Sequence, residues 1–329
     1  MKRREFITLL GCSAAAWPLG ARAQQGERVR RVGMLHGATE LDKSTSDRIS
    51  VFREGLAKLG WVEPRNLRID LRFAGGEAGR IRAGAAELVS LAPDAIVTAT
   101  GAATRELQRQ TQTIPIIITG AGDPSDTQIV KNISRPEGNI TGITNLYASI
   151  PGKWVELLKQ VSPGIERMGL VYNAQVGSLL TQVPVIQNAA RALSLKAVEI
   201  PYQDAVDLVH GIDGFGAEAN GGLIVLPPNP NASNRAVIRR LAERYRLPAI
   251  YQAAEFAAEG GLLAYGSNPL FNYQRAAYFV DRILRGAKVV DLPLEFPTKF
   301  ELVINLRAAK AIGLTGPESL VLIADEVIE

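Results

Sequence analysis

Histidine and cysteine, which often serve in catalysis and metal binding, are almost absent from this sequence. The 329 residues include two histidines, His36 and His210, and one cysteine, Cys12. No His-x-x-x-His or Glu-x-x-His pattern of a metal site occurs, and neither a Gly-x-Ser-x-Gly elbow nor a Gly-Lys-Ser/Thr phosphate loop is present. His36 is the best catalytic candidate, but a solitary histidine is more often an ordinary hydrogen-bonding residue. We therefore expect no enzyme, no cofactor and no metal site.

Small and polar residues follow several apolar segments that we interpret as strands. In a doubly wound sheet, ligands bind beyond the carboxyl ends of the strands. His36 and Gly37 follow the first strand, and Thr100, Gly101 and Ala102 lead from the third strand into a helix. A helix N-terminus built of small residues exposes backbone N–H groups that suit a ligand carboxylate. An ordinary tight strand-to-helix turn explains the same residues equally well.

A single carboxylate follows the fourth predicted strand. Asp123 stands among small residues and precedes Pro124. Its carboxylate can pair with a ligand ammonium group. Because Asp followed by Pro is a common helix start, Asp123 can instead cap a helix.

The second half of the chain offers aromatic and amide side chains at matching strand ends. The candidates for ligand contact are Tyr172, Asn173, Pro227, Asn229, Tyr251 and Tyr265. Aromatic faces combined with a few polar groups suit a small amphipathic solute. Each tyrosine can equally belong to the core. We expect Tyr265 to end a strand near a crossing between the two halves.

Apolar runs alternate with amphipathic stretches along the chain, which predicts an α/β fold. In the first half, the predicted strands are 32–35, 67–73, 95–100 and 114–119, and the predicted helices are 46–59, 78–90 and 102–110. In the second half, the predicted strands are 168–172, 196–200, 222–226 and 248–250, and the predicted helices are 152–160, 178–193 and 233–245. A long helix over 268–286 and a strand over 300–305 complete the pattern.

The restart of this pattern near residue 144 predicts two lobes, each with a doubly wound parallel sheet. We expect the first lobe over 30–144 plus about 267–291, and the second over 145–266 plus about 292–329. The segment 138–143 is predicted to be the first crossing of a multi-strand hinge, because its glycines would absorb backbone rotation.

Residues 1–23 resemble an export signal. A basic start precedes a short apolar stretch, and Ala21-Arg22-Ala23 predicts cleavage near Ala23, so we expect a periplasmic protein. The paired Arg3 and Arg4 favour twin-arginine export, with ordinary secretory export as the alternative. The segment 9–12 also resembles a lipoprotein signal, although little apolar chain precedes Cys12.

The charges outside this signal nearly balance. Of the 37 basic and 33 acidic residues, four basic and one acidic lie in residues 1–23, which leaves 33 and 32. Such a balance argues against nucleic acid as a partner, because phosphate contacts require a basic surface. Removal of the signal also removes Cys12, which excludes disulfides and thiolate sites from the remaining chain.

Several long motifs are similar to those of a known family. They are the run Ile114-Pro115-Ile116-Ile117-Ile118-Thr119-Gly120 leading to Asp123-Pro124, the run Ser134-Arg135-Pro136-Glu137-Gly138-Asn139-Ile140-Thr141-Gly142, and the C-terminal segments 297–306, 311–314 and 324–328. The chain resembles the tryptophan/tyrosine-type substrate-binding proteins of ABC transporters. This resemblance implies the type I periplasmic-binding fold, with a ligand cleft between two lobes.

The resemblance also implies a function and a placement of the ligand. The protein would be the solute-binding component of an ABC importer, would act as a monomer and would deliver a small organic solute to a membrane permease. An amino acid ligand would place its carboxylate at Thr100 to Ala102 and its ammonium at Asp123. The loops 100–104 and 227–230 differ from those of tryptophan-binding members, so an aromatic or other amino acid is only the default ligand.

Two other roles share this fold. A sensory protein that presents its ligand to a chemoreceptor or a sensor kinase is the main alternative. A transcriptional repressor would need an N-terminal DNA-binding helix pair, and the export signal occupies that place.

Overall fold

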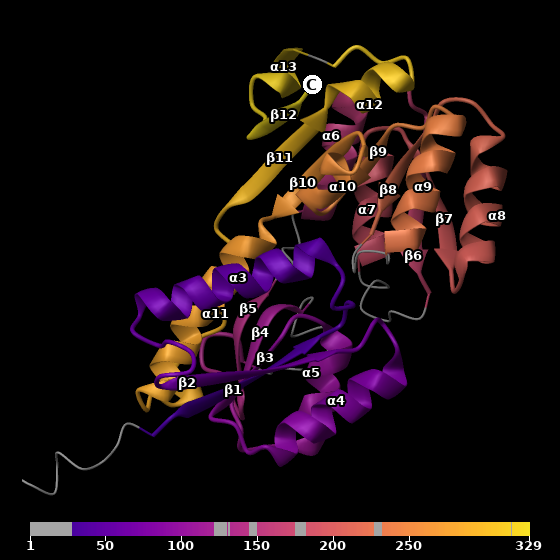
Figure 1. Ribbon diagram of the computed structural model, residues 1–329. Coiled ribbons are helices and arrows are strands. Elements are labelled where there is room, and N and C mark those ends of the chain that lie inside the picture. Colours follow the sequence, from indigo (N-terminus) through magenta and orange to yellow (C-terminus); the bar gives the residue numbers. More distant parts are fainter. Residues whose placement is uncertain are drawn as a thin grey trace, which may run out of the picture.

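The computed structural model describes residues 28–121, 130, 132–144, 150–174, 182–226, 232–316 and 318–329. None of the helices in these ranges combines the length and the hydropathy that a membrane span requires. The described chain forms two α/β units that lie one above the other, and the C-terminus is at the far end of the second unit (Figure 1).

The first sheet consists of five strands in the order β2-β1-β3-β4-β5, and all of its neighbours are parallel. The strands are β1 (Arg30–His36), β2 (Leu67–Phe73), β3 (Ala95–Thr98), β4 (Ile116–Ala121) and β5 (Ile140–Thr144). Its helices are α3 (Lys43–Lys58), α4 (Ala78–Ser90), α5 (Gly101–Gln110) and α11 (Pro269–Leu284).

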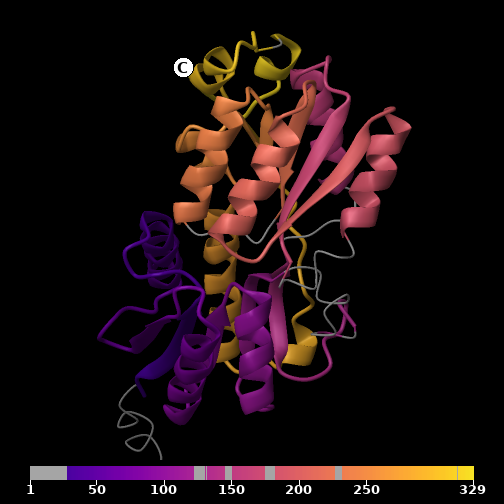
Figure 2. The same ribbon diagram turned by 90° about the vertical axis from the view of Figure 1, so that its right-hand side faces the viewer.

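Helices cover both faces of the first sheet. Phe52 of α3 and Phe279 of α11 pack with Val32 on one face, where the two helices lie side by side. Leu88 of α4 and Leu107 of α5 are buried on the other face. Helix α11 therefore belongs to the first sheet although it comes late in the sequence (Figures 1 and 2).

The second sheet consists of seven strands in the order β12-β11-β10-β9-β8-β6-β7. The strands are β6 (Arg167–Asn173), β7 (Lys196–Tyr202), β8 (Gly221–Val225), β9 (Ala249–Tyr251), β10 (Leu263–Ser267), β11 (Phe300–Asn305) and β12 (Glu326–Ile328). Its helices are α6 (Ile150–Val161), α7 (Gln182–Ala192), α8 (Ala205–Gly216), α9 (Ala232–Arg244), α10 (Ala254–Ala258), α12 (Leu306–Ala311) and α13 (Glu318–Val321). A 3-10 turn, η2 (Val289–Asp291), follows α11 in the sequence.

Helices also sandwich the second sheet. Trp154 of α6 and Ile186 of α7 are buried on one face, and Ile212 of α8 and Ile238 of α9 on the other. Strand β11 runs antiparallel to β10, whereas the other neighbouring strands are parallel. The predicted α/β class with two doubly wound parallel sheets is confirmed, with β11 and β12 at one edge of the second sheet running opposite to its other described strands.

The prediction that 138–143 is a hinge crossing was wrong. This segment leads into β5, the edge strand of the first sheet, which pairs with β4. Gly142 has a φ of +125°, and a Cβ there would collide with the main chain of Ile118. Glycine is therefore required for close strand packing and not for rotation between the lobes. The connection from β5 to α6 runs through 145–149, outside the described residues.

The segment after η2 remains on the first sheet further than predicted. Leu292 and Leu294 are buried in the two cores of that sheet. Glu295 accepts a hydrogen bond from the Thr144 N–H (3.0 Å) through its main-chain oxygen, and its side chain pairs with Arg275 of α11. The return to the second sheet therefore begins after Glu295 and not near 292.

Candidate functional site

The carboxyl ends of β1 and β3 bring two of the predicted segments together. His36 ends β1, and Gly37 lies directly against Thr100 of the turn that follows β3. A Cβ on Gly37 would be 2.9 Å from the Thr100 Cγ2, so only glycine fits there without a shift. The structure thus places His36, Gly37 and the start of α5 at one edge of the first sheet.

Thr100 is the N-cap of α5. Its Oγ1 accepts a hydrogen bond from the Ala103 N–H (3.2 Å), as expected of an ordinary helix start. Gly101 and Ala102 occupy the first two helical positions, where the N–H groups have no acceptor within the helix. Gly101 is half-buried and Ala102 is exposed, so the helix N-terminus is open to a ligand.

His36 is a buried, neutral ring in a stack of three. It lies between Phe73 (5.4 Å between ring centroids) and Tyr273 of α11 (6.0 Å) and is only 4% exposed. Burial lowers the pKa of His36 to about 4, and the nearby charge of Arg48 contributes to this shift. The buried Nε2 atom has no hydrogen-bond partner among the described residues.

Residues that the sequence analysis missed complete this edge. Arg48 reaches it from α3, and Tyr273 and Asn272 reach it from the start of α11. The Asn272 Nδ2 donates to the main-chain oxygen of Thr119 (3.3 Å), which ties α11 to the end of β4. The sequence placed Asn272 and Tyr273 on the predicted helix 268–286. It could not show that they contact strand ends, because the tertiary fold determines those contacts.

Two of the predicted second-lobe tyrosines belong to the core, the alternative considered for each of them. Tyr172 is 5% exposed, packs under α6 and α7, and donates a hydrogen bond from its hydroxyl to the Glu199 Oε2 (2.6 Å). Tyr251 is 2% exposed and stacks on Phe256 (4.6 Å) on the opposite face of the sheet.

The remaining second-lobe candidates differ in placement. Asn173 is half-buried at the end of β6. Tyr265 is not at a strand end, because it is the central residue of β10, where it stacks on Phe300 (6.0 Å). Gln252, which was not among the predicted residues, is buried just after β9. The glycine at 266 lets β10 approach the main chain of Gln252 closely. Asp123, Pro227 and Asn229 lie outside the described residues.

A cavity of about 240 Å³ lies between the two units, beside the end of β10. Its lining includes Ser44 and Asp47 from α3, Glu255 from α10, and Asn268 from the β10–α11 junction. None of the predicted ligand-contact residues is among the residues that line it. The described part of the chain also contains no group of three or more His, Cys, Asp or Glu residues arranged to hold a metal ion.

The two stacked α/β units with this polar and aromatic edge have the architecture of a type I periplasmic solute-binding protein. A crystal structure of a conserved domain protein from Vibrio cholerae has a TM-score of 0.85 and 24% identity, covering 91% of this chain and 100% of the other. A Streptococcus pneumoniae ABC domain solved with L-Trp has a TM-score of 0.84 and 22% identity, covering 91% and 99%.

The chain belongs to the family of ABC transporter substrate binding proteins, whose sequence pattern it matches over residues 42–328. A relative from Clostridioides difficile, described as a tyrosine-binding protein, is 25% identical over 267 residues, which cover 80% of this chain and 75% of the relative. The resemblance deduced from the sequence motifs is confirmed.

Proposed function

We propose that this protein is the exported solute-binding component of an ABC importer. It binds a small organic solute, by default an aromatic or other amino acid, between the two sheets and presents it to a membrane permease. The protein acts as a monomer in the periplasm and performs no chemistry on the solute. Family membership and the ligands named for two similar proteins, tyrosine and L-Trp, support this proposal.

The observation that carries the proposal is the open N-terminus of α5 beside His36. Gly101 and Ala102 present N–H groups at the positive end of the helix dipole, which suits a carboxylate. The neighbouring His36 is neutral at pH 7 because its pKa is about 4, and it contributes an aromatic edge without charge. Asp123, chosen from the sequence alone, is our candidate for the ligand ammonium group.

Thermal unfolding of the purified protein against a panel of solutes tests the proposal. The panel contains tyrosine, tryptophan, branched amino acids, sugars, and aromatic analogues that lack the carboxylate or the ammonium. A solute at 100 times its dissociation constant should add about 2.7 kcal/mol to the free energy of unfolding. We expect this shift from an aromatic amino acid and none from the analogue without a carboxylate. A shift produced by sugars alone would contradict the amino acid assignment.

Two substitutions at one position test the helix N-terminus directly. Gly101→Pro removes one N–H at the first helical position, which tolerates proline, and Thr100 already has the extended backbone that a following proline requires (φ −117°, ψ 144°). Gly101→Ala keeps the N–H and is the matched control. We expect Gly101→Pro to weaken amino acid binding about tenfold, because it removes a hydrogen bond to a charged group. Equal affinities of the two variants would contradict this placement of the carboxylate.

A further inference from the structure

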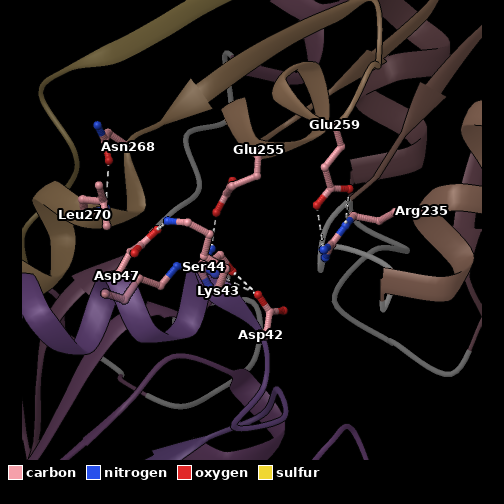
Figure 3. Close-up of polar contacts among 10 residues, drawn as sticks. Asp42, Lys43, Ser44, Asp47, Arg235, Glu255, Glu259, Asn268 and Leu270 are labelled. Atoms are coloured by element: carbon pink, nitrogen blue, oxygen red, sulfur yellow. Dashed lines mark hydrogen bonds and ion pairs between the residues drawn. The ribbon is translucent and has the colours of Figure 1, made fainter.

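Two glutamates one helical turn apart each pair with an arginine, but only one of these pairs joins the two units. Glu259, just after α10, pairs with Arg235 of α9 through two hydrogen bonds of 3.0 and 2.9 Å. This pair lies within the second unit. Glu255 of α10 pairs with Arg48 of α3, which is 207 residues away in the sequence and belongs to the first unit. Figure 3 shows both glutamates, with Glu255 directed toward α3 and Glu259 toward Arg235.

Arg48 belongs to this pair and also lies near the carboxyl edge of the first sheet, where the ligand site is predicted. Its charge lies close enough to act on the buried rings of His36 and Tyr273. Its side chain is 20% exposed, and its Nε is buried without a hydrogen-bond partner among the described residues. Glu255 is 30% exposed and borders the cavity between the units. The pair is therefore partly shielded from water. Solvent and salt screen the attraction between its two charges less than they would in a fully exposed pair.

We propose that Arg48 and Glu255 form a latch that holds the two units together and thereby sets the affinity for the solute. The contact exists only when α3 and α10 approach each other, so it favours the closed arrangement. If the closed arrangement is less populated before binding, the apparent affinity falls by the same factor. The effect on affinity rests on the proposed function, whereas the effect on closure does not.

The two glutamates provide a matched pair of variants. Glu255→Gln removes the charge from the latch, and Glu259→Gln removes the same charge one turn away without affecting a contact between the units. Spin labels at Arg82→Cys on α4 and Arg240→Cys on α9, both exposed positions, would report the separation of the units in a Cys12→Ser background. We expect Glu255→Gln to lengthen the distances between the two labels in the ligand-free protein. The label distances in Glu259→Gln should equal those of the labelled protein that keeps both glutamates.

Affinity supplies the second readout. We expect Glu255→Gln to weaken amino acid binding about fivefold, the size of a modest ion pair, and Glu259→Gln to leave it within about twofold. In the double variant Arg48→Met/Glu255→Gln, the glutamate substitution should add nothing to the effect of Arg48→Met on the label distances.

Each outcome separates the latch from the proposed function. Identical distance distributions for the two glutamate variants, with and without solute, would overturn the latch. Weaker binding by Glu255→Gln without any change in distance would also overturn it, because Glu255 would then act on the solute. A shift in distance in a protein that binds no amino acid would support the latch and contradict the proposed function.

Discussion

The two sheets of this protein differ in how the residues at their strand ends, where a ligand was predicted, are surrounded. At the carboxyl edge of the first sheet, His36 lies next to Gly37, which contacts Thr100 at the start of α5, and the His36 ring stacks on Tyr273 of α11 and is close to the charge of Arg48 on α3. In the second sheet, Tyr172 and Tyr251 hold corresponding strand-end positions, but both are packed into the core. Position along a strand locates the edge of a sheet, whereas the side on which a residue lies follows from its alternation within the strand.

The difference assigns distinct tasks to the two units. The first supplies an open helix N-terminus and a buried, neutral ring whose Nε2 has no partner among the described residues. The second supplies a large apolar core, Glu255 of the latch, and the polar ends Asn173 and Gln252. Substitutions in the first unit should therefore change solute binding, and those of the second-unit tyrosines should change stability.

The largest expected effect is a loss of stability in Tyr251→Ala. Removing this buried ring from its stack with Phe256 leaves a cavity, and we expect the free energy of unfolding to fall by about 4 kcal/mol. Solute affinity should stay within about twofold in the folded variant. Denaturant unfolding and calorimetric titration measure the two quantities. A tenfold loss of affinity with unchanged stability would place Tyr251 in the binding site.

The next effect is a dependence of stability on pH that originates in His36. Because burial lowers its pKa from 6.5 to about 4, the unfolded chain takes up a proton in this range while the native state does not. Stability should therefore decrease as the pH falls from about 6.5 to about 4, by roughly 3 kcal/mol from this residue.

The variant His36→Leu isolates that contribution. We expect it to lack this part of the pH dependence and to remain about as stable as the wild type at pH 7, because it replaces a buried polar ring with an apolar side chain. Unfolding curves of both proteins at several pH values provide the comparison. Parallel pH profiles would show that His36 is protonated in the native state as readily as in the unfolded chain.

The smallest effect is expected from Tyr172→Phe. This change removes the hydroxyl that donates to Glu199 and leaves the packed ring in place, so stability should fall by about 1 kcal/mol. Solute affinity should not change. If the free energy of binding fell by more than the free energy of unfolding, Tyr172 would contact the ligand. The two sheets would then not differ in the way described.

Local signals in the sequence predicted many elements closely. Strand 67–73 and helix 78–90 match β2 and α4, and the helix predicted over 268–286 matches α11 with its caps. The Asn268 Oδ1 accepts from the Leu270 N–H (2.8 Å), and Gly286 has a φ of +95° after the helix end. These features depend on residues near each other in the chain.

Features that depend on distant residues were not predicted. Helix α8 was missed for a local reason instead, because glycines at 211, 214 and 216 obscure its periodicity although Asp204 caps it. The glycine at 142 indicated a hinge, but the requirement for it comes from Ile118 on the neighbouring strand. Nothing local to Arg48 indicates a partner that is 207 residues away.

The central claim is that a carboxylate-bearing solute binds between the two sheets. Titration of isotopically labelled protein with tyrosine and tryptophan, followed by amide NMR, tests it most directly. We predict saturable shifts at Gly101 and Ala102 of the first unit together with Asn173 and Gln252 of the second. Shifts confined to one unit, or gathered on α12 and α13 at the far end of the second unit, would contradict the account.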